Sequence, residues 1–332
     1  MGAPKYSVIV PVYNRPEELE ELLHTLCDQT HGDFEVIVVE DGSTVKADDV
    51  VKQFPNLDIA YYFKENEGQG FARNYGFEKA KGEFLLVFDS DVLLPNHYFD
   101  SLDSFLANNE IDAFGGPDAA HPSFTNIQKA ISHSMTSFLT TGGIRGKKQH
   151  VGQFHPRSFN MGMRRTVYET IGGYKIPFMG EDMELSTRLI ESGFKTALIE
   201  HAFVYHKRRT SFIKFFEQLK YFGRARINIT RFFPDQLKLV HLFPTFFTFG
   251  IIAAILMLLL IPAAGMIMVG FYSLYFLVIS IEAGIKYKSI GVALLAPIAA
   301  FLQLTGYGLG LVYEWMRKLI GIDPNTPYTK LY

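Results

Sequence analysis

A short apolar stretch that ends in two acids constrains the fold of this chain most. Residues Phe84–Phe88 are apolar without a break, which is typical of a strand buried on both faces of a parallel sheet. Asp89 and Asp91 follow at once, and open α/β sheets bind ligands beyond the carboxyl ends of their strands. Two such carboxylates can hold a hard divalent cation together with phosphate oxygens. The stretch predicts a metal-diphosphate site, with a solvated Asp-Ser-Asp turn as the alternative.

Charge and cysteine content narrow the class of protein. The formal net charge of −2 over 332 residues gives no basic field of the kind that attracts nucleic acid. Cys27 is the single cysteine, so an internal disulfide is excluded and a reducing compartment is expected. The first six residues contain no apolar run, so we expect no signal peptide.

The C-terminal third is far more apolar than the rest. Residues 239–281 contain no Asp, Glu, Lys or Arg, and residues 290–312 are also uncharged. These runs are too long for ordinary core helices and predict two to three membrane segments, at about 240–261, 265–282 and 290–313. A break is expected near Pro262 to Gly265. A very apolar soluble helical domain is the alternative.

The N-terminal part alternates strand and helix patterns. Apolar runs predict strands at residues 6–13, 34–39, 59–63 and 84–88. Between them, leucines at helical spacing predict a helix over residues 17–27, and a second helix is expected to open at Gly68 to Gly70. This order predicts an α/β domain with a mostly parallel sheet.

Six short motifs occur in one order along the first two thirds of the chain. They are Val10-Pro-Val-Tyr-Asn14, Glu40-Asp-Gly-Ser43, Gly70-Phe-Ala-Arg-Asn-Tyr-Gly76, Asp89-Ser-Asp91, Asn160-Met-Gly-Met-Arg164 and Gly180-Glu-Asp-Met-Glu-Leu185. With them the chain resembles the family 2 glycosyltransferases over about residues 6–226. The resemblance implies a GT-A fold, with a Rossmann-like and mostly parallel sheet, and a sugar-transferase activity.

The resemblance also implies a nucleotide site at the strand ends. Asp41 would accept a hydrogen bond from a uracil or guanine N–H, Arg73 would face the nucleotide, and Asp89 would contact the ribose. The walls of the base site would be Pro11, Tyr13 and Glu40. The alternatives are a simple turn at Asp41 and an exposed helical arginine at position 73.

A metal site follows from the same resemblance. Asp91 would ligate Mg²⁺ or Mn²⁺ on the diphosphate, where the ion neutralises charge on the leaving group. His206 would be a further ligand, because the family often places a histidine after a strand that we expect at residues 196–205. A packed core histidine is the alternative. The sequence has no close Cys/His cluster, so a structural zinc is not expected.

The second acidic motif supplies the catalytic candidates. The resemblance implies that Asp182 is the general base that deprotonates the acceptor hydroxyl, with Glu181 as an orienting neighbour. One displacement would invert the anomeric centre. The alternative is that these acids only cap a helix N-terminus.

Residues that would bind the acceptor are spread over two regions. Residues 113–160 are expected to bind the acceptor, with Asn160 among its contacts, and the glycine-rich basic segment 140–148 reads as a lid or as a plain flexible loop. Residues 211–231 mix phenylalanines at helical spacing with Lys and Arg, which is typical of a basic helix in the membrane interface or of an ordinary surface helix. The acceptor or lipid-phosphate candidates in and before this helix are Arg208, Arg209, Gln218 and Arg224.

The segment around Gln218 departs from the Q-x-x-R-W box of processive synthases. Tyr221 and Phe222 stand where the box has Arg and Trp, which disfavours a cellulose- or hyaluronan-synthase interpretation.

Topology is predicted from charge. The basic residues before the first apolar segment place the catalytic domain in the cytoplasm, at the inner (plasma) membrane. A third full span would put Arg317 and Lys318 outside, whereas a re-entrant segment bent near Pro297 would keep them inside. The predicted divisions are a catalytic domain at 1–208, an interfacial helix region at 209–236 and a membrane domain at 237–332.

Together these features predict an inverting, metal-dependent glycosyltransferase. It would move one sugar from a nucleoside-diphosphate sugar, expected to be a UDP-sugar, to a lipid-linked saccharide. The alternatives are a polyprenyl-phosphate sugar transferase and a non-catalytic membrane scaffold that keeps the fold. A homo-oligomer stays open, and a transporter is disfavoured because no apolar segment carries a charge at its middle.

Overall fold

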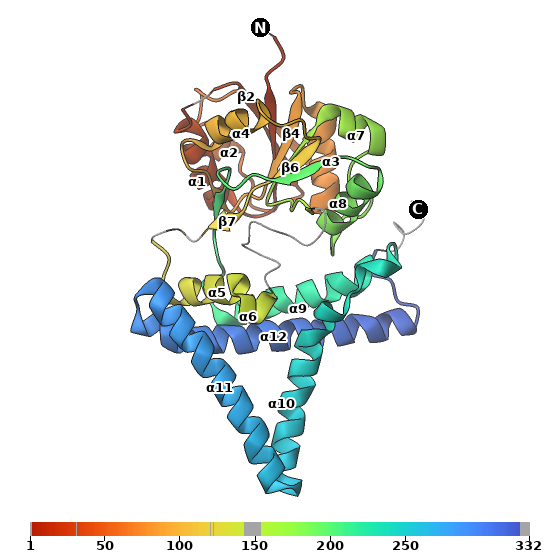
Figure 1. Cartoon of the computed structure of the whole chain (residues 1–332). Helices are drawn as coiled ribbons and strands as arrows, with labels where there is room; N and C mark the ends of the chain where they lie inside the picture. Colours follow the sequence, from red (N-terminus) through yellow and green to blue (C-terminus); the bar gives the residue numbers. More distant parts are fainter. Residues whose placement is uncertain (1, 31, 120, 122, 143–153, 326–332) are drawn as a thin grey trace. The chain divides into compact units, whose positions relative to one another are not determined.

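The computed structural model describes residues 2–30, 32–119, 121, 123–142 and 154–325, which form two compact units (Figure 1). Unit 1 comprises Met1–His121, Lys148–Lys207 and Asn325–Tyr332. Unit 2 comprises Pro122–Lys147 and Arg208–Pro324. Pro122–Lys147, which lies in sequence between two segments of unit 1, therefore belongs to the same unit as the C-terminal helices.

Unit 1 is built on a seven-stranded sheet with the strand order β3-β2-β1-β4-β8-β6-β9. Four neighbouring pairs are parallel, and β8 runs antiparallel to both β4 and β6. The strands are β1 (Tyr6–Val12), β2 (Phe34–Asp41), β3 (Ile59–Lys64), β4 (Phe84–Phe88), β6 (Ala113–Gly115), β8 (Asn160–Arg164) and β9 (Thr196–Leu198). The predicted mostly parallel sheet is confirmed.

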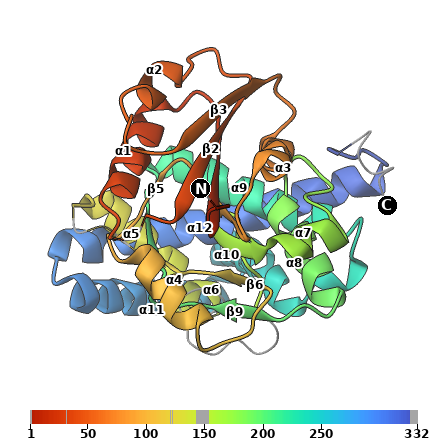
Figure 2. The same ribbon diagram turned by 90° about the horizontal axis from the view of Figure 1, so that it is seen from above.

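Both faces of this sheet are buried because its central strands are largely apolar: β4 is apolar at every position, whereas β1 and β2 also bury the bonded pair Ser7 and Glu35. In β1, Val8 and Val10 belong to one hydrophobic cluster, whereas Ile9 belongs to another on the opposite face. The first face is covered by α1 (Pro16–Cys27) and α4 (Tyr98–Leu106). The second is covered by α3 (Gln69–Lys79), α7 (Arg165–Ile171) and α8 (Glu181–Glu191) (Figure 2). The short helix α2 spans Asp48–Val51.

The carboxyl ends of β1 and β2 are tied together by the turn at Asn14. Asn14 has a φ of 53°, a left-handed conformation that asparagine tolerates. Its Oδ1 accepts hydrogen bonds from the backbone N–H groups of Thr44 and Val45, each at 2.9 Å. These bonds hold the loop after β2 beside the end of β1.

A second sheet of three strands carries the histidine that follows the predicted strand. It pairs β5 (Val92–Leu93), β10 (Val204–His206) and β7 (Asp118–Ala119). The expected single strand at 196–205 is wrong, because the chain turns after Leu198 and continues as β10 in this other sheet. His206 pairs with Val92, so the fold brings the histidine next to the residue that follows Asp91.

Unit 2 is helical. Its helices are α5 (Asn126–Thr136), α6 (Phe138–Thr141), α9 (Phe212–Ile229), α10 (Phe243–Leu260), α11 (Pro262–Tyr287) and α12 (Ile290–Leu319), with single 3-10 turns at η1 (Pro234–Gln236) and η2 (Leu239–Leu242). Among the residues that the structure describes, three helical stretches are long and apolar enough to cross a membrane: Leu239–Leu260, Pro262–Tyr287 and Ile290–Leu319.

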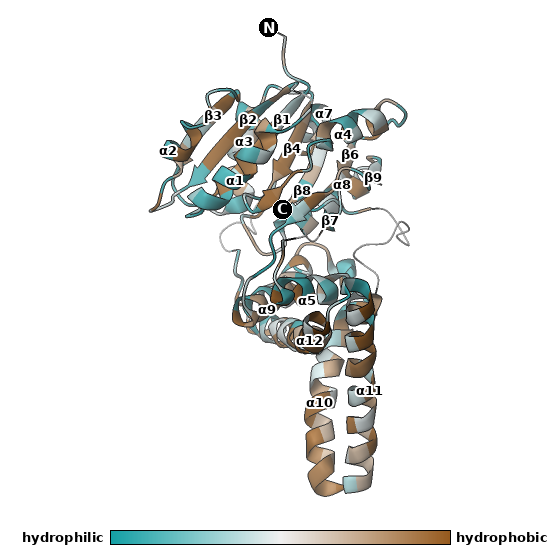
Figure 3. Ribbon diagram, turned by 90° about the vertical axis from the view of Figure 1, so that its left-hand side faces the viewer, coloured by the Kyte–Doolittle hydropathy of each residue, from teal (hydrophilic) through white to brown (hydrophobic). Residues whose placement is uncertain are grey.

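The three apolar helices are not arranged alike. α10 and α11 form a hairpin that turns at Ile261, and its apolar colouring runs along both helices (Figure 3). α12 packs along α9 and lies crosswise at the open end of the hairpin (Figures 1 and 3). Of the two alternatives for the third apolar segment, the break near Pro297 is not seen, because α12 continues as one helix through this residue.

Candidate active site

Arg73 of α3 is the centre of a buried ionic network in unit 1. Its side chain is 2% exposed; Nη2 lies 2.8 Å from Asp89 Oδ1 and Nη1 lies 3.1 Å from Glu181 Oε1. Gln69 also donates to Glu181, and the guanidinium lies 5.4 Å from the ring centre of Tyr174. One guanidinium thus joins the acid after β4 to the acid that begins α8. Arg73 is not the exposed helical arginine of the alternative interpretation.

Asp89, Asp91 and His206 form a group that can hold a metal ion. One potential ligand atom from each lies within 4.8 Å of the others, and His206 Nε2 lies 3.2 Å from Asp91 Oδ1. Two carboxylates and one imidazole suit Mn²⁺ or Mg²⁺ better than a soft metal. The donor set therefore fits the expected ion.

The two residues before α8 have positive φ angles, which few residues other than glycine adopt easily. Gly180, just before α8, has a φ of 106°, and Met179 before it has a φ of 66°. These conformations begin α8 so that Glu181 and Asp182 occupy its first turn. There the helix N-terminus favours negative charge.

The two acids differ in their protonation. Burial raises the pKa of Glu181 above its usual range, and the nearby Asp182 adds to this, although Arg73 opposes it. Burial, the largest single influence, would also raise the pKa of Asp182, but the ion pair with Arg157, the charge of Arg73 and the Met183 N–H together leave the pKa below the usual range. Arg157 Nη1 lies 3.1 Å from Asp182 Oδ2, and the Asp182 side chain is 25% exposed. Asp182 is therefore ionised at neutral pH and reachable.

Asp41 is held by three donors, one from the last residue of β3 and two from the segment that follows it. Oδ1 lies 3.1 Å from both Lys64 Nζ and the backbone nitrogen of Glu67, and Oδ2 lies 3.0 Å from the backbone nitrogen of Gly68. A carboxylate oxygen has two lone pairs, so Oδ2 keeps room for one further donor. Asp41 thus fixes the approach to α3 and can still accept a bond from a base.

Glu40 and Tyr13 lie in contrasting environments. Glu40 is fully buried; its Oε2 accepts bonds from Ala47 N at 2.8 Å and from the Tyr61 hydroxyl at 3.0 Å, and Ser43 donates to Oε1. Its carboxylate is used to hold the loop after β2. Tyr13 is 53% exposed just beyond β1, and Pro11 is half-buried within β1.

Asn160 does not have the surroundings of an acceptor ligand. It is fully buried at the start of β8, where Oδ1 accepts from the Tyr98 hydroxyl at 2.6 Å and Nδ2 donates to the Ala202 carbonyl at 2.8 Å. These bonds join β8 to neighbouring elements, so the expected acceptor contact is replaced by a role in the core.

The other acceptor candidates belong to a different part of the chain. Arg208, Arg209, Gln218 and Arg224 all lie in unit 2, the last two on α9. The segment at 140–148 falls mostly outside the described residues, which end at Gly142 before resuming at Phe154.

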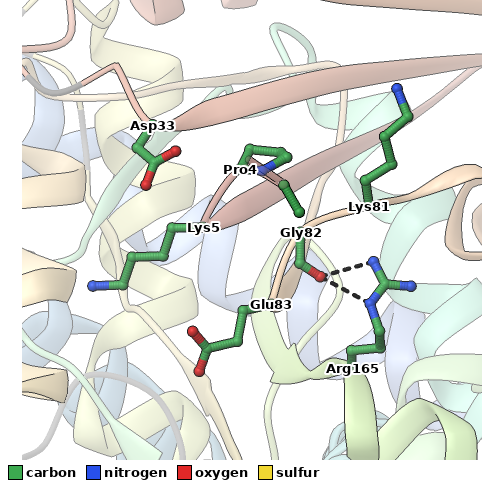
Figure 4. A pocket seen from close by; sticks show the side chains of 8 residues that line it. Pro4, Lys5, Asp33, Lys81, Gly82, Glu83 and Arg165 are labelled. Carbon is green, nitrogen blue, oxygen red and sulfur yellow. Dashed lines mark hydrogen bonds between the residues drawn. The ribbon is translucent and has the colours of Figure 1, made fainter. Parts of the chain in front are cut away.

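A shallow pocket of about 440 Å³ lies at the other edge of the sheet (Figure 4). It is lined by residues next to the amino ends of β1, β2 and β4, among them Lys5, Asp33 and Glu83. The acids of the candidate site follow the carboxyl ends of these strands, so this pocket is not part of that site.

A comparison with protein families decides the classification. The sequence model described as Glycosyl transferase family 2 matches residues 7–172, which are half of the chain. The chain belongs to glycosyl transferase family 2. The matched range includes Asp41, Arg73, Asp89 and Asp91 and ends before Glu181.

Curated relatives of this family 2 chain resemble it over part of their length. A putative teichuronic acid biosynthesis glycosyltransferase, TuaG of Bacillus subtilis, is 37% identical over 91 residues, which cover 26% of this chain and 36% of the relative. The putative glycosyltransferase EpsH of the same species is 34% identical over 104 residues, which cover 31% of this chain and 30% of the relative. The match thus spans about a third of each relative.

A solved structure resembles nearly the whole chain. The mannosyltransferase PcManGT of Pyrobaculum calidifontis, in complex with GDP-Man and Mn²⁺, aligns with a TM-score of 0.59 at 18% identity. The alignment covers 95% of this family 2 chain and 88% of the other. At this identity the likeness concerns the fold, and it supports the GT-A architecture.

Two site residues were missed by sequence reasoning. Arg15 Nη1 lies 2.9 Å from Asp91 Oδ2, and Arg157 pairs with Asp182. Arg15 stands within the turn after the first strand, which is a weak signal, whereas no motif marks Arg157.

Proposed function

We propose that this chain is an inverting glycosyltransferase that moves one sugar from a nucleoside-diphosphate sugar to a lipid-carried saccharide. The observation that carries the proposal is the bridge made by Arg73 between Asp89 and Glu181. Through this one guanidinium, Asp89, which is expected to contact the nucleotide, is joined to Glu181, the neighbour of the expected base Asp182.

The donor end of the site would be formed at the carboxyl edge of the sheet. Asp41 would accept the base N–H, and Asp89 would contact the ribose. Asp91 and His206 would hold Mg²⁺ or Mn²⁺, which stabilises negative charge on the leaving diphosphate when it is bound. The mannosyltransferase with a similar fold was solved with GDP-Man and Mn²⁺, which supports a metal and a nucleotide sugar here. A UDP-sugar is the donor that we would test first.

Asp182 would act as the general base. It is ionised, partly exposed and at the start of α8, so it can accept the proton of the acceptor hydroxyl. The hydroxyl oxygen then attacks the sugar C1 opposite the diphosphate, and this single displacement inverts the anomeric centre. Arg157 has to leave Asp182 or turn aside for this step. Glu181 stays bonded to Arg73 and Gln69 and orients the start of the helix.

The acceptor is proposed to be carried by a lipid because unit 2 is suited to a membrane. Leu239–Leu260 has 22 residues, and at about 1.5 Å each it matches the roughly 30 Å of a bilayer core. We propose that α10 and α11 cross as a two-span hairpin while α9 and α12 lie in the interface. All basic residues flanking these helices then stay on the cytoplasmic side with the catalytic domain.

The saccharide nature of the acceptor rests on the relatives. TuaG is named for teichuronic acid biosynthesis, which is the synthesis of a bacterial polysaccharide. Polysaccharide precursors carried on a lipid would place the growing end next to a membrane-associated enzyme. The proposed divisions remain 1–208, 209–236 and 237–332.

Transfer of radiolabelled sugar tests this proposal. Membranes that contain the protein, native lipid extract and Mn²⁺ are offered a panel of sugar nucleotides, and label in the organic phase is counted. We expect label from one donor in the wild type and none with Asp182→Asn or Asp91→Ala.

The products separate the alternatives. A mild-acid-labile lipid monophosphate sugar would instead identify a polyprenyl-phosphate sugar transferase. Nucleotide binding without any transfer would favour a non-catalytic scaffold, and transfer that survives Asp182→Asn would exclude Asp182 as the base.

A further inference from the structure

Arginines from two helices of unit 2 converge on one buried carboxylate. Glu314 of α12 has a side chain that is 0% exposed. Its Oε2 lies 3.1 Å from Arg224 Nε and 3.6 Å from Arg317 Nε, and its Oε1 lies 3.1 Å from Arg231 Nη2. Arg224 belongs to α9, Arg231 follows it, and Arg317 is in the last turn of α12. We call these four residues with Lys318 the Glu314 cluster.

The Glu314 cluster contains more positively charged side chains than negatively charged ones. Lys318 bonds only to oxygens of Thr230 among its described hydrogen bonds, the hydroxyl at 2.7 Å and the carbonyl at 3.1 Å. Four cations therefore face one carboxylate, a surplus of three charges. The C-terminal ends of α9 and α12 offset about one charge in total, at roughly half a charge each. A positive surplus in a partly buried place attracts an anion.

The guanidinium groups of the cluster are not all satisfied by hydrogen bonds. The Nε atom of Arg231 is buried and has no hydrogen-bond acceptor in the part of the chain that is described, and Arg317 Nε has only its ion pair with Glu314 at 3.6 Å. The planar guanidinium suits the oxygens of a phosphate. Tyr313 stacks against this group, with its ring centre 5.3 Å from Arg224 and 5.7 Å from Arg317. We propose that the Glu314 cluster binds the phosphate of an anionic membrane lipid.

A lipid is favoured over a soluble phosphate because apolar side chains surround the cluster on α12. Trp315, Met316 and Leu319 are 53%, 61% and 69% exposed and alternate in sequence with Glu314, Arg317 and Lys318. Tryptophan and tyrosine are enriched where headgroups meet acyl chains, and basic residues there attract anionic headgroups. The headgroup would meet the arginines while the acyl chains cover these apolar residues. This lipid site lies in unit 2 and would exist whether or not the chain transfers a sugar.

Native mass spectrometry of the full-length protein in detergent tests the site. The affinity for phosphatidylglycerol is compared with that for phosphatidylcholine of the same acyl chains, in the wild type and in three variants. Arg317→Gln removes one cation, Glu314→Gln removes the central carboxylate, and Lys214→Gln is the control at an exposed position of α9. Tm is measured for each to check folding.

We expect the wild type to prefer phosphatidylglycerol. Arg317→Gln should weaken that affinity about fivefold, the usual effect of one basic residue at an anionic surface, with phosphatidylcholine unaffected. Glu314→Gln should keep or tighten it, because the surplus charge rises, and Lys214→Gln should leave it unchanged.

Four results would overturn the proposal. Three are equal affinity of the wild type for both lipids, an unchanged affinity in Arg317→Gln, and weaker binding of phosphatidylglycerol by a folded Glu314→Gln protein; the fourth comes from a soluble control. Inorganic pyrophosphate is the soluble control: binding of phosphatidylglycerol that resists excess pyrophosphate supports the lipid, and displacement by it excludes the lipid as occupant. If Arg317→Gln does not fold, the Glu314→Gln affinity decides.

Discussion

Arg15 Nη1 lies 2.9 Å from Oδ2 of Asp91, the carboxylate proposed to ligate the metal. The Arg15 side chain is 36% exposed and follows the left-handed turn at Asn14, so it is tethered at the backbone but has space to rotate. A cation of the chain therefore neutralises Asp91 before any metal binds. The ion would have to compete with it.

Removal of Arg15 should strengthen metal binding. We expect Arg15→Gln to bind Mn²⁺ about threefold to tenfold more tightly in the absence of nucleotide, since about 1 kcal/mol of repulsion and competition is lost. Titration followed by the Mn²⁺ electron paramagnetic resonance signal measures this directly. Lys52→Gln, which removes an exposed cation at the C-terminal cap of α2, is the control and should not change the affinity. Unchanged or weaker Mn²⁺ binding by Arg15→Gln would show that the pair does not compete with the ion.

The Arg73 bridge should matter for both stability and activity. Arg73→Gln leaves the buried Glu181 without its cation, which costs about 3–5 kcal/mol of unfolding free energy. Arg73→Lys keeps the charge but cannot place two separate N–H groups on Asp89 and Glu181. We therefore expect a large loss of kcat with only a small decrease in Tm. Denaturant unfolding and steady-state rates measure the two effects. Arg165→Lys, at the opposite edge of the sheet, should keep kcat, and equal kcat in Arg73→Lys would contradict a positioning role.

The Arg157–Asp182 pair predicts a pH effect. Arg157 is the main cause that lowers the pKa of Asp182, and burial opposes it. Asp182 therefore stays ionised as the pH falls below the usual aspartate range, and the stability from its ion pair is lost only when the pH falls through that depressed pKa. In Arg157→Gln the pKa should rise, so the acidic limb of the rate profile should move to higher pH.

Initial rates over a pH series would show this shift. A thermal melt at each pH separates loss of the base from unfolding. A profile that keeps its acidic limb in Arg157→Gln would mean that another group limits the rate in acid.

Close contact between α9 and α12 predicts a selective effect of alanine. A Cβ at Gly310 would lie 2.0 Å from the carbonyl oxygen of Lys220, so the two backbones would have to separate. Gly310→Ala should cost about 1–3 kcal/mol, the usual penalty for overpacking, and lower Tm. Gly270→Ala in α11 meets no atom within 4 Å, so it should be neutral or slightly stabilising. Equal Tm for both variants would contradict the close α9–α12 packing.

Much of the fold follows from local patterns. Apolar runs, unbroken in β4 and interrupted by Ser7 in β1 and by Glu35 in β2, marked these three strands because a strand buried on both faces carries mostly apolar side chains. The glycines before Arg73 marked the start of α3, and the break at Pro262 marked the turn between α10 and α11. The order of motifs indicated the family, which the match over residues 7–172 confirms.

The candidate site was only partly predictable. Asp89 and Asp91 could be placed together because both directly follow the carboxyl end of β4, and the fold adds His206 through the pairing of β10 with β5. The amide of Asn160 stands in a motif, yet it is fully buried and bonds to Tyr98 and Ala202 within unit 1. A motif locates a residue, but the atoms around its side chain determine whether a polar group is left for a ligand.

The sequence by itself determined which faces are buried, where strands end in acids and which helices are apolar enough for a membrane, because these properties are written in the local spacing of side chains. The tertiary structure alone decided that Arg15 meets Asp91 76 positions away, that Arg157 meets Asp182, and that α12 lies across the α10–α11 hairpin. The physical reason is that an ion pair or a helix crossing depends on contacts between residues far apart in sequence. Local periodicity does not specify which of many possible partners will meet when the chain packs.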